Sequence, residues 1–417
     1  MTLRRLAIIS VHASPLAPFG GKKTGGMNVY VRELAQELAR RGIEVDIFTR
    51  RSSEDEPEVD ERLGSGIRVV YLTAGGVRPL SPDELYPHLS EFTAKLIAFA
   101  TMRSLRYDMV YSHYWLSGWV AQKLKEAWNV PFVQMFHTLG QMKRRLQTSD
   151  ALLPDQRIST ETQIVEWADR IIAATPAEHA QLLWLYRAKR CKIDIVPPGV
   201  NTARFTPLSQ EEAKARLGFE ACHVLLFVGR LEPLKAVDSV LKALAHIRDV
   251  APRLLDSLCF VVVGGDLESD DAEMLRLRRL TDELNLREVV KFMGAREPHE
   301  LPLFYAAASA VVMPSDYESF GMVALEAMAS GRPVIASRVG GLAFVVRDSE
   351  TGYTVPVRDS QALAEKIIVL LNDASQRQAM GLRASQLALE YAWSNIADRL
   401  LAIFNDVQGQ RVSRRKH

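Results

Sequence analysis

The chain of 417 residues is long enough for two domains, each with its own hydrophobic core. Its composition, with 47% hydrophobic and 24% charged residues, is that of a globular protein, and no apolar run is long enough to span a membrane. The formal net charge of +2 excludes a strong overall field that would attract nucleic acid.

The three cysteines, Cys191, Cys222 and Cys259, are far apart in the sequence and form no CxxC pair or Cys/His cluster. This spacing argues against a disulfide framework and against a structural zinc site. The apolar part of the N-terminal segment is only residues 6–11, and His12 and prolines follow it. A buried strand is therefore favoured over a signal peptide, and we expect a cytoplasmic protein.

In the first half of the chain, buried strands alternate with amphipathic helices. Residues 6–11 are predicted to form the first strand, and a long glycine-rich loop, 12–26, leads into a helix over 27–41. With the strand predicted at 45–48, this order favours a parallel sheet with right-handed crossovers. The loop lacks a GxGxxG fingerprint, but the glycine pair that ends at Gly26 suits an anion or phosphate at a helix start.

The same alternation continues to the middle of the chain. The acidic segment 54–61 is expected to be an exposed loop. Further strands are predicted at 67–72, 109–112, 132–136, 171–174 and 193–196, and helices over 83–103, from 116, over 158–168 and from 176.

Polar residues follow two of these strands at the point where each strand ends. His113 and Tyr114 come after the strand at 109–112, and His137 and Thr138 come after the next one. A single histidine is more often a hydrogen-bonded structural residue than part of a site. In open α/β sheets, however, ligands bind at the carboxyl ends of the strands, so two histidines at one edge favour a site.

The segment Val-Pro-Pro-Gly-Val at 196–200 is the strongest boundary signal, because two prolines and a glycine after a strand make a stiff linker. We predict two doubly wound α/β domains, 1–198 and 199–392, that face each other across a cleft, with the helix 393–410 packing back on the first. In the second domain, strands are predicted at 223–228, 258–264, 289–293, 310–313, 333–337 and 353–356, and helices at 237–250, 271–284, 298–308, 322–329, 360–371 and 375–391.

The first strand-to-helix loop of the second domain contains two cations, Arg230 and Lys235. Two cations in such a loop suit a diphosphate, although a surface loop with two exposed cations is the simpler reading of the composition. The nearest approach to a metal-binding DxD motif is Asp266-Leu267-Glu268, so we predict no required metal ion.

The stretch Pro314–Val339 combines a strand end, a polar turn and a helix start. Glu318 lies in the turn, Phe320-Gly321 lies at the probable helix start, and Glu326 lies about two turns into the helix. Free N–H groups at a helix start suit an anionic or hydroxyl-rich ligand, and a glycine lets it approach the backbone. The two acids could hold hydroxyls at two points of one ligand, or they could simply be solvated.

Taken in order, these motifs resemble the retaining glycosyltransferases of family 4, which have the two-domain GT-B fold. The resemblance runs through nearly the whole chain. The residues that carry it are GGMNVYV at 25–31, the strand-end His137, PPGV at 197–200, Gly229-Arg230-Leu231 with Lys235, and the E-x7-E motif Glu318 to Glu326.

The resemblance implies a role for each of these residues. Arg230 and Lys235 would neutralise the donor diphosphate, and Glu318 and His137 would contact the transferred sugar; these four are the expected catalytic residues. The implied donor-binding residues are Gly26, Arg230, Lys235, Arg296, Glu318, Phe320, Gly321, Met322, Val323 and Glu326, and the implied acceptor-binding residues are Asn28, Tyr114, Thr138, Lys143 and Arg157.

Within the family, the segments HYWLSG at 113–118 and FHTLGQMK at 136–143 resemble the branch of the inositol-phosphate N-acetylglucosaminyltransferases of mycothiol synthesis. The sucrose-phosphate synthases, whose acceptor is also a sugar phosphate, are a close second. The first branch implies a lysine for the acceptor phosphate in the loop 80–85. Pro82 occupies that position here, so either the nearby Arg78 substitutes or the acceptor differs.

The implied reaction is transfer of a hexosyl unit from a UDP-sugar, UDP-glucose or UDP-GlcNAc, to a hydroxyl of a small phosphorylated sugar or inositol, with retained configuration. Loss of the diphosphate builds negative charge on the leaving oxygen, so preorganised cations are the main catalytic asset. No cofactor other than the donor is implied, and the oligomeric state is open.

The sequence leaves two alternative functions open. A phosphorylase or epimerase on the same fold is one, although no recognisable setting for a pyridoxal-phosphate lysine is present. A non-catalytic, two-lobed sugar-binding protein is another. The basic run Tyr186–Lys192, which follows an apolar Leu-Leu-Trp-Leu, allows an interfacial helix and weak peripheral contact with an anionic membrane.

Overall fold

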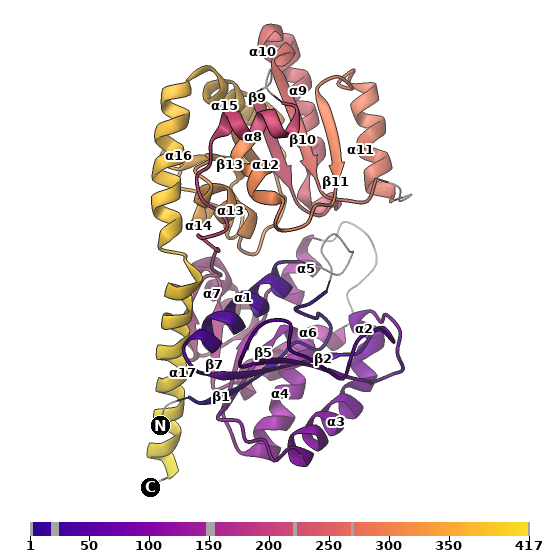
Figure 1. Ribbon diagram of the computed structural model, residues 1–417, viewed down its shortest axis with the longest axis vertical. Helices are drawn as coiled ribbons and strands as arrows, with labels where there is room; N and C mark the ends of the chain where they lie inside the picture. The colour runs from indigo at the N-terminus through magenta and orange to yellow at the C-terminus, as the bar shows by residue number, and fades with distance from the viewer. Residues whose placement is uncertain (1–2, 18–24, 147–154, 220–222, 268–270, 416–417) are drawn as a thin grey trace. The chain divides into compact units, whose positions relative to one another are not determined.

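The computed structural model describes residues 3–17, 25–146, 155–219, 223–267 and 271–415, which form two compact units (Figure 1). Unit 1 comprises the described residues up to Pro197 together with 393–415, and unit 2 comprises Pro198–Ala392. The chain therefore passes from unit 1 to unit 2 one residue before the expected boundary, and it returns to unit 1 at Trp393.

Unit 1 is built on an eight-stranded sheet of order β3-β4-β2-β1-β5-β6-β7-β8. All neighbouring strands are parallel except β3 and β4. Its elements are β1 (Arg5–Ile9), α1 (Gly26–Arg40), β2 (Glu44–Arg50), β3 (Val59–Asp60), β4 (Ile67–Leu72), α2 (Pro82–Leu85), η1 (Tyr86–His88), α3 (Leu89–Met102), β5 (Met109–His113), α4 (Tyr114–Trp128), β6 (Phe132–Met135), α5 (Gly140–Leu146), α6 (Asp155–Trp167), β7 (Arg170–Ala173), α7 (Pro176–Tyr186), η2 (Arg190–Lys192), β8 (Ile193–Ile195) and α17 (Trp393–Arg415).

Helices cover both faces of this sheet, so most of its strands are buried along nearly their whole length. Figure 1 shows α3 and α4 on one face and α1 on the other. The C-terminal helix α17 packs beside α1: Arg41 Nε donates a hydrogen bond of 2.9 Å to Asp398 Oδ1, and the Trp393 ring meets Tyr30 edge-on at 5.2 Å. The last helix of the chain is thus part of unit 1.

Unit 2 contains a six-stranded, fully parallel sheet of order β11-β10-β9-β12-β13-β14. Its core gathers the apolar residues of β9, β10 and β12 against α9 and α15. Its elements are α8 (Gln210–Leu217), β9 (His223–Val228), η3 (Pro233–Lys235), α9 (Val237–Val250), α10 (Pro252–Asp256), β10 (Leu258–Val263), α11 (Ala272–Glu283), β11 (Val290–Gly294), α12 (Leu301–Ala307), β12 (Ala310–Met313), α13 (Met322–Ala329), β13 (Val334–Ser337), α14 (Leu342–Val345), β14 (Gly352–Val355), α15 (Ser360–Asn372) and α16 (Ala374–Leu389).

Each sheet has one point where the chain reverses its direction of growth. In unit 1 this point lies between β1 and β5, and in unit 2 it lies between β9 and β12, because later strands are added on opposite sides of it. At such a switch point the two strand-end loops diverge and leave a crevice where open α/β sheets bind ligands. The predicted fold class, two doubly wound parallel sheets with helices, is confirmed.

Several local predictions were wrong. The expected loop 54–61 contains the short strand β3, which pairs antiparallel with β4. The helix expected over 83–103 is divided into α2, η1 and α3, because Pro87 lacks an N–H group and cannot continue a helix. Short helices such as α5 and α8 were missed because they are too short to show a period. Cys259 is disulfide-bonded, which the wide spacing of the cysteines did not predict.

The interfacial helix considered for Tyr186–Lys192 does not form. Helix α7 ends at Tyr186, and Arg187 takes a left-handed conformation with φ of 54° before the short turn η2. Trp184 on α7 is nevertheless 82% exposed. In the described part of the chain, no helix has the length and apolar character needed to cross a bilayer.

Candidate functional site

The switch point of unit 2 carries an ion pair between two of the predicted site residues. Lys235 ends the η3 turn after β9, and Glu318 lies in the turn after β12. Lys235 Nζ donates a hydrogen bond of 2.5 Å to Glu318 Oε2, and the two side chains are only 22% and 17% exposed. Because β9 and β12 are neighbours in the sheet, the loops that follow them meet, although the residues are 83 positions apart.

The turn that contains Glu318 is held from both sides. The Asp316 amide donates to the Leu234 carbonyl oxygen at 2.9 Å, and the Gly341 amide donates to the Glu318 carbonyl oxygen at 3.0 Å. A Cβ atom at Gly341 would lie 2.1 Å from the Cα of Phe320, so only glycine permits this approach. The position of the Glu318 carboxylate is therefore set by backbone contacts with two neighbouring loops.

Helix α13 begins directly after this turn. Gly321 is its N-cap residue and has a φ of 97°, which a residue with a side chain rarely adopts. The amides of Met322 and Val323 follow in the first turn, where N–H groups have no partner within the helix. Phe320 is buried beneath them. This helix start can thus present backbone donors to a ligand near Glu318.

Glu326, further along α13, is oriented by a residue that the sequence did not indicate. The Tyr305 hydroxyl on α12 donates a hydrogen bond of 2.7 Å to Glu326 Oε2. Burial, together with the charge of Glu326, raises the pKa of Tyr305 well above its usual value. Tyr305 therefore remains a donor, and its hydroxyl fixes one oxygen of the Glu326 carboxylate.

The two predicted arginines of unit 2 lie apart from this ion pair. Arg230 Nη1 is 2.7 Å from Glu232 Oε1, and its side chain is 48% exposed. Arg296 pairs with Glu300 at 3.8 Å and lies over the Phe304 ring. Within the described part of the chain, neither arginine is hydrogen-bonded to the pair at the switch point.

The switch point of unit 1 brings three imidazole rings and one phenol ring together. The His12 and Tyr114 rings lie 4.3 Å apart, and His113 Nδ1 is 2.9 Å from His137 Nε2. Burial, with a smaller effect of the nearby His12, lowers the pKa of His137 to about 3. Burial and the charge of His137 lower the pKa of His113 well below its usual value. Both imidazoles are therefore neutral at physiological pH.

Two residues at these strand ends have unusual backbone conformations. Tyr114 has a φ of 75° and His137 a φ of 61°, in the left-handed region where residues other than glycine are uncommon. Such a conformation costs on the order of 1 kcal/mol or more, and it persists only where the surroundings enforce it. Residues with this strain cluster at functional sites, which makes this edge of the sheet a candidate site.

Arg157 lies at the centre of a buried polar cluster in unit 1. Its Nε donates to Glu161 Oε1 at 2.7 Å, its Nη1 to the Tyr114 hydroxyl at 3.1 Å, and its Nη2 to the Thr138 carbonyl oxygen at 2.8 Å. The side chains of Arg157 and Glu161 are 4% and 0% exposed. Because Glu161 balances its charge, Arg157 holds Tyr114 and Thr138 in place more than it attracts an anion.

The remaining predicted residues of unit 1 lie in the first loop and on α5. Asn28 is buried; its Nδ2 donates to the Ser14 carbonyl oxygen at 2.7 Å and its Oδ1 accepts from the Gly25 amide at 3.1 Å. These bonds fix the loop beside Gly26, which is exposed at the start of α1. Lys143 on α5 is also exposed.

Sequence reasoning missed two residues of these clusters. Glu161 lies four positions after Arg157 on α6, and an acid at this spacing is a standard signal of a helical ion pair. Tyr305 gave no signal, because its contact depends on how α12 packs. Among the described residues, no group of three or more His, Cys, Asp or Glu side chains could hold a metal ion.

Two doubly wound domains with polar residues at the switch point of each sheet are the architecture of the GT-B glycosyltransferases. Comparisons with known proteins agree: residues 24–204 match the family described as Glycosyltransferase Family 4, and residues 209–387 match Glycosyl transferases group 1. The chain belongs to the family 4 type of glycosyltransferases.

Individual relatives cover nearly the whole chain. The D-inositol 3-phosphate glycosyltransferase of Kineococcus radiotolerans is 42% identical over 99% of this chain and 98% of its own length, and that of Acidothermus cellulolyticus is 41% identical over 98% and 92%. The solved structure of a sucrose-phosphate synthase from Thermosynechococcus elongatus has a TM-score of 0.89 at 33% identity and covers 98% of this chain and 100% of its own. The resemblance to these two branches is therefore confirmed.

Proposed function

We propose that this glycosyltransferase moves a hexosyl unit from UDP-glucose or UDP-GlcNAc to a hydroxyl of a small phosphorylated acceptor, and that the configuration is retained. The observation that carries the proposal is the Lys235–Glu318 ion pair at the switch point of unit 2. It provides one cation for a diphosphate and one carboxylate for sugar hydroxyls, beside a helix start with free amides.

On the donor side, binding would separate the ion pair. Lys235, assisted by Arg230, would turn to the diphosphate, and Glu318 would accept hydrogen bonds from the sugar. Glu326, oriented by Tyr305, would hold the ribose. The remaining donor contacts that we propose are Gly26, Arg296, Phe320, Gly321, Met322 and Val323.

On the acceptor side, Tyr114, Thr138 and Arg157 form a preorganised, hydrogen-bonded surface. The exposed Lys143 is the side chain best suited to meet an acceptor phosphate, because its charge is accessible to solvent. Asn28 would complete the acceptor site from the first loop.

An inositol phosphate is the first candidate acceptor, since the curated relatives above carry that acceptor in their names. Pro82 favours a second candidate, fructose 6-phosphate. It opens the short helix α2 after the N-cap Ser81, at the position where the inositol-phosphate branch implies a lysine. The nearest substitute, Arg78, is 63% exposed and lies 3.6 Å from Glu84.

In the proposed mechanism, the acceptor hydroxyl attacks from the face that the diphosphate leaves. The C–O bond to the acceptor forms as the bond to the leaving oxygen breaks, and that oxygen takes the acceptor proton. The cations Lys235 and Arg230 stabilise the charge on the leaving group, so we propose that no metal ion is needed. A neutral His137 would hydrogen-bond the sugar without adding charge beside an oxocarbenium-like centre.

A donor-by-acceptor screen that follows UDP release tests the proposal. Its acceptors are inositol phosphate, fructose 6-phosphate and a lipid, with water as the blank, and its metal requirement is checked with a chelator. We expect release above the blank with one phosphorylated acceptor and an NMR spectrum of the product that shows retention. Release equal to the blank for both phosphorylated acceptors would overturn the proposed function, and an inverted product would overturn the mechanism.

A further inference from the structure

Arg358 lies in the turn between β14 and α15 and contacts both loops that carry the ion pair of unit 2. Its Nη2 donates to the Pro233 carbonyl oxygen at 3.3 Å, two residues before Lys235. Its Nε and Nη2 donate to the two carboxylate oxygens of Asp316 at 2.7 and 2.5 Å, two residues before Glu318. One guanidinium group therefore joins the Lys235 loop to the Glu318 turn.

A third anchor fixes this guanidinium to the body of unit 2. Arg358 Nη1 donates to both carboxylate oxygens of Asp238, at 2.9 and 3.0 Å, in the first turn of α9. Asp238 is 3% exposed and also pairs with Lys242 at 3.2 Å and with Arg276 at 3.5 Å. Burial acts to raise the pKa of Asp238, but the Lys242 hydrogen bond and the charges of Arg358 and Arg276 lower it overall. Asp238 is thus a fixed negative charge.

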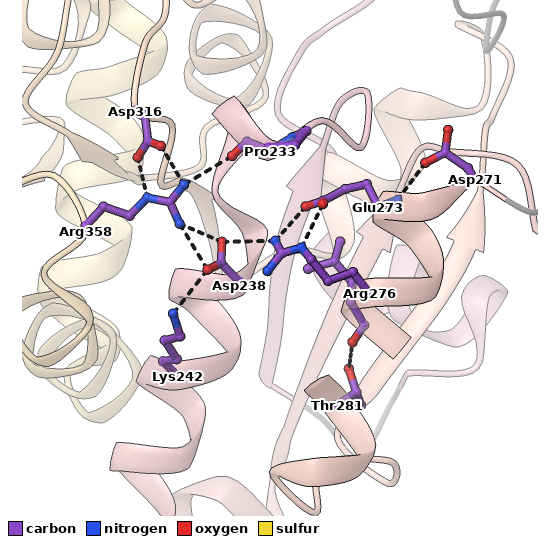
Figure 2. Close-up of polar contacts among 10 residues, drawn as sticks. Pro233, Asp238, Lys242, Asp271, Glu273, Arg276, Thr281, Asp316 and Arg358 are labelled. Carbon is purple, nitrogen blue, oxygen red and sulfur yellow. Dashed lines mark hydrogen bonds and ion pairs between the residues drawn. The ribbon is translucent and has the colours of Figure 1, made fainter. Parts of the chain in front are cut away.

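Figure 2 shows these contacts as one connected network, with Arg358 between Asp316 and Asp238 and with Arg276 on the other side of Asp238. Arg276 is held in turn by Glu273, through bonds of 2.7 and 2.8 Å. Both arginines therefore contact the Asp238 carboxylate, but their other contacts lie on different elements. In the described contacts, only Arg358 extends to the two loops.

An exposed ion network by itself adds little to stability, and the Arg358 side chain is 42% exposed. The contacts of Arg358 indicate a role beyond this small contribution to stability. The Asp316 amide bonds to the Leu234 carbonyl oxygen between the same two loops, so the guanidinium reinforces an existing backbone bridge. Arg358 also keeps a left-handed φ of 60°, which costs energy in a residue with a side chain. A planar fork with several donors suits such multiple bridging, and a lysine does not.

We propose that Arg358 is a positioning residue for the transfer reaction: it holds the Lys235 loop and the Glu318 turn at the spacing that the donor requires, without touching the donor. This inference rests on the proposed function of that site. A displacement of about 1 Å at a reacting centre can lower a rate by about 100-fold, so loosening this bridge has a large kinetic effect.

The kinetic test compares Arg358→Met with Arg276→Met, which removes the other arginine from Asp238 and leaves both loops bridged. We expect Arg358→Met to lower kcat at saturating UDP-sugar by about 10- to 100-fold, with a smaller change in KM. The Arg276→Met variant should keep kcat within about twofold. Arg358→Lys, which retains the charge but not the fork, should fall between the wild type and Arg358→Met.

Hydrogen exchange of the Asp316 amide provides a measurement that does not depend on activity. In Arg358→Met this amide should exchange faster than in the wild type, and in Arg276→Met it should not. Unchanged exchange in Arg358→Met, or an equal fall of kcat in both methionine variants, would overturn the positioning role. If the wild type transfers no sugar, the proposed function fails, while the exchange rates still decide whether Arg358 holds the loops.

Discussion

The switch points of the two units have the same topology, but their charged groups differ in exposure and in how they are balanced. In unit 2, a partly accessible lysine and glutamate face each other from the loops after β9 and β12. In unit 1, the polar groups are neutral or internally balanced: the partly buried His137 is uncharged because its pKa is lowered to about 3, and the buried Arg157 is paired with Glu161. Under the proposed function, the unit 2 site would exchange its ion pair for contacts with the charged donor. The unit 1 site is a preorganised surface of hydrogen-bonding groups.

Under the proposed function, this difference would give the two sites different tasks. A diphosphate leaving group needs positive charge, which Lys235 would provide once donor binding separates its ion pair with Glu318. An acceptor hydroxyl needs exact placement, which the bonds from Arg157 to Tyr114 and Thr138 can provide. Under the proposed function, a cation beside a carboxylate would thus serve ligand binding in unit 2, where the pair is partly exposed, and positioning in unit 1, where it is buried.

Glu161→Gln should have the largest effect on stability. The change leaves Arg157 buried without a balancing charge and weakens the bonds that Glu161 accepts from the Gly140 amide and the Tyr186 hydroxyl. Removing one partner of a buried ion pair costs about 3–5 kcal/mol. All six tryptophans lie in unit 1, so their fluorescence during urea unfolding reports this unit alone.

The matched control for that prediction is Glu318→Gln in unit 2. It breaks the more accessible ion pair and should cost at most about 1 kcal/mol, measured by circular dichroism of the whole protein. Equal losses for the two variants would show that the two ion pairs do not differ as the comparison requires.

Lys235→Ala should have the largest effect on activity. Removal of one preorganised charge that stabilises a leaving group typically lowers kcat by about 100- to 1,000-fold. The measurement is UDP release at saturating donor and acceptor. Lys291→Ala, which removes an exposed lysine of β11 in the same unit, should leave kcat unchanged. A kcat for Lys235→Ala close to that of the wild type would remove this lysine from the mechanism.

Because the histidines of unit 1 are neutral, the stability of unit 1 should depend on pH. The pKa of His137 is about 3 in the folded protein and about 6.5 in an unfolded chain, so the unfolded state binds the proton first as the pH falls. Unit 1 should therefore have its full stability above pH 6.5 and lose it progressively towards pH 3, by at most about 1.4 kcal/mol per pH unit for this group.

Tryptophan fluorescence of urea unfolding between pH 7 and pH 5 measures this loss. In His137→Gln the slope of unfolding free energy against pH should be smaller than in the wild type. The same slope in both proteins would mean that His137 is charged in the folded state, and the electrostatic contrast between the two sites would then be incorrect.

Much of the fold could be predicted because apolar runs and their Gly or Pro boundaries are local signals. The strands at 223–228 and 310–313 and the helices at 237–250 and 322–329 have the predicted bounds. The helix expected over 83–103 is interrupted around Pro87, which the apolar pattern alone does not show. The short helices were also not predicted, since tertiary contacts rather than periodicity stabilise them.

The candidate site was predictable residue by residue but not as a set of contacts. Lys235 and Glu318 were each identified from their own loops, yet their pairing depends on β9 lying next to β12. Arg358 was missed entirely, because its partners Asp238 and Asp316 lie 120 and 42 positions away and no local pattern marks it. Long-range packing decides which side chains meet, and a single sequence does not display that.

The smallest effect on ligand binding or activity is predicted for Tyr305, which the sequence also did not indicate. Tyr305→Phe keeps the ring in its packed position and removes only the hydroxyl that donates to Glu326. The loss of one hydrogen bond to a charged group should weaken UDP binding by about 1–2 kcal/mol, or about 5- to 30-fold, with little change in kcat at saturating donor. Titration calorimetry with UDP measures the affinity directly. If Tyr305→Phe lowers kcat and leaves UDP affinity unchanged, then Glu326 acts in the transition state rather than in binding the ribose. Unit 2 would then contain both kinds of group, because Lys235 and Glu318 would exchange their ion pair for the ligand while Glu326 would act as a positioned group.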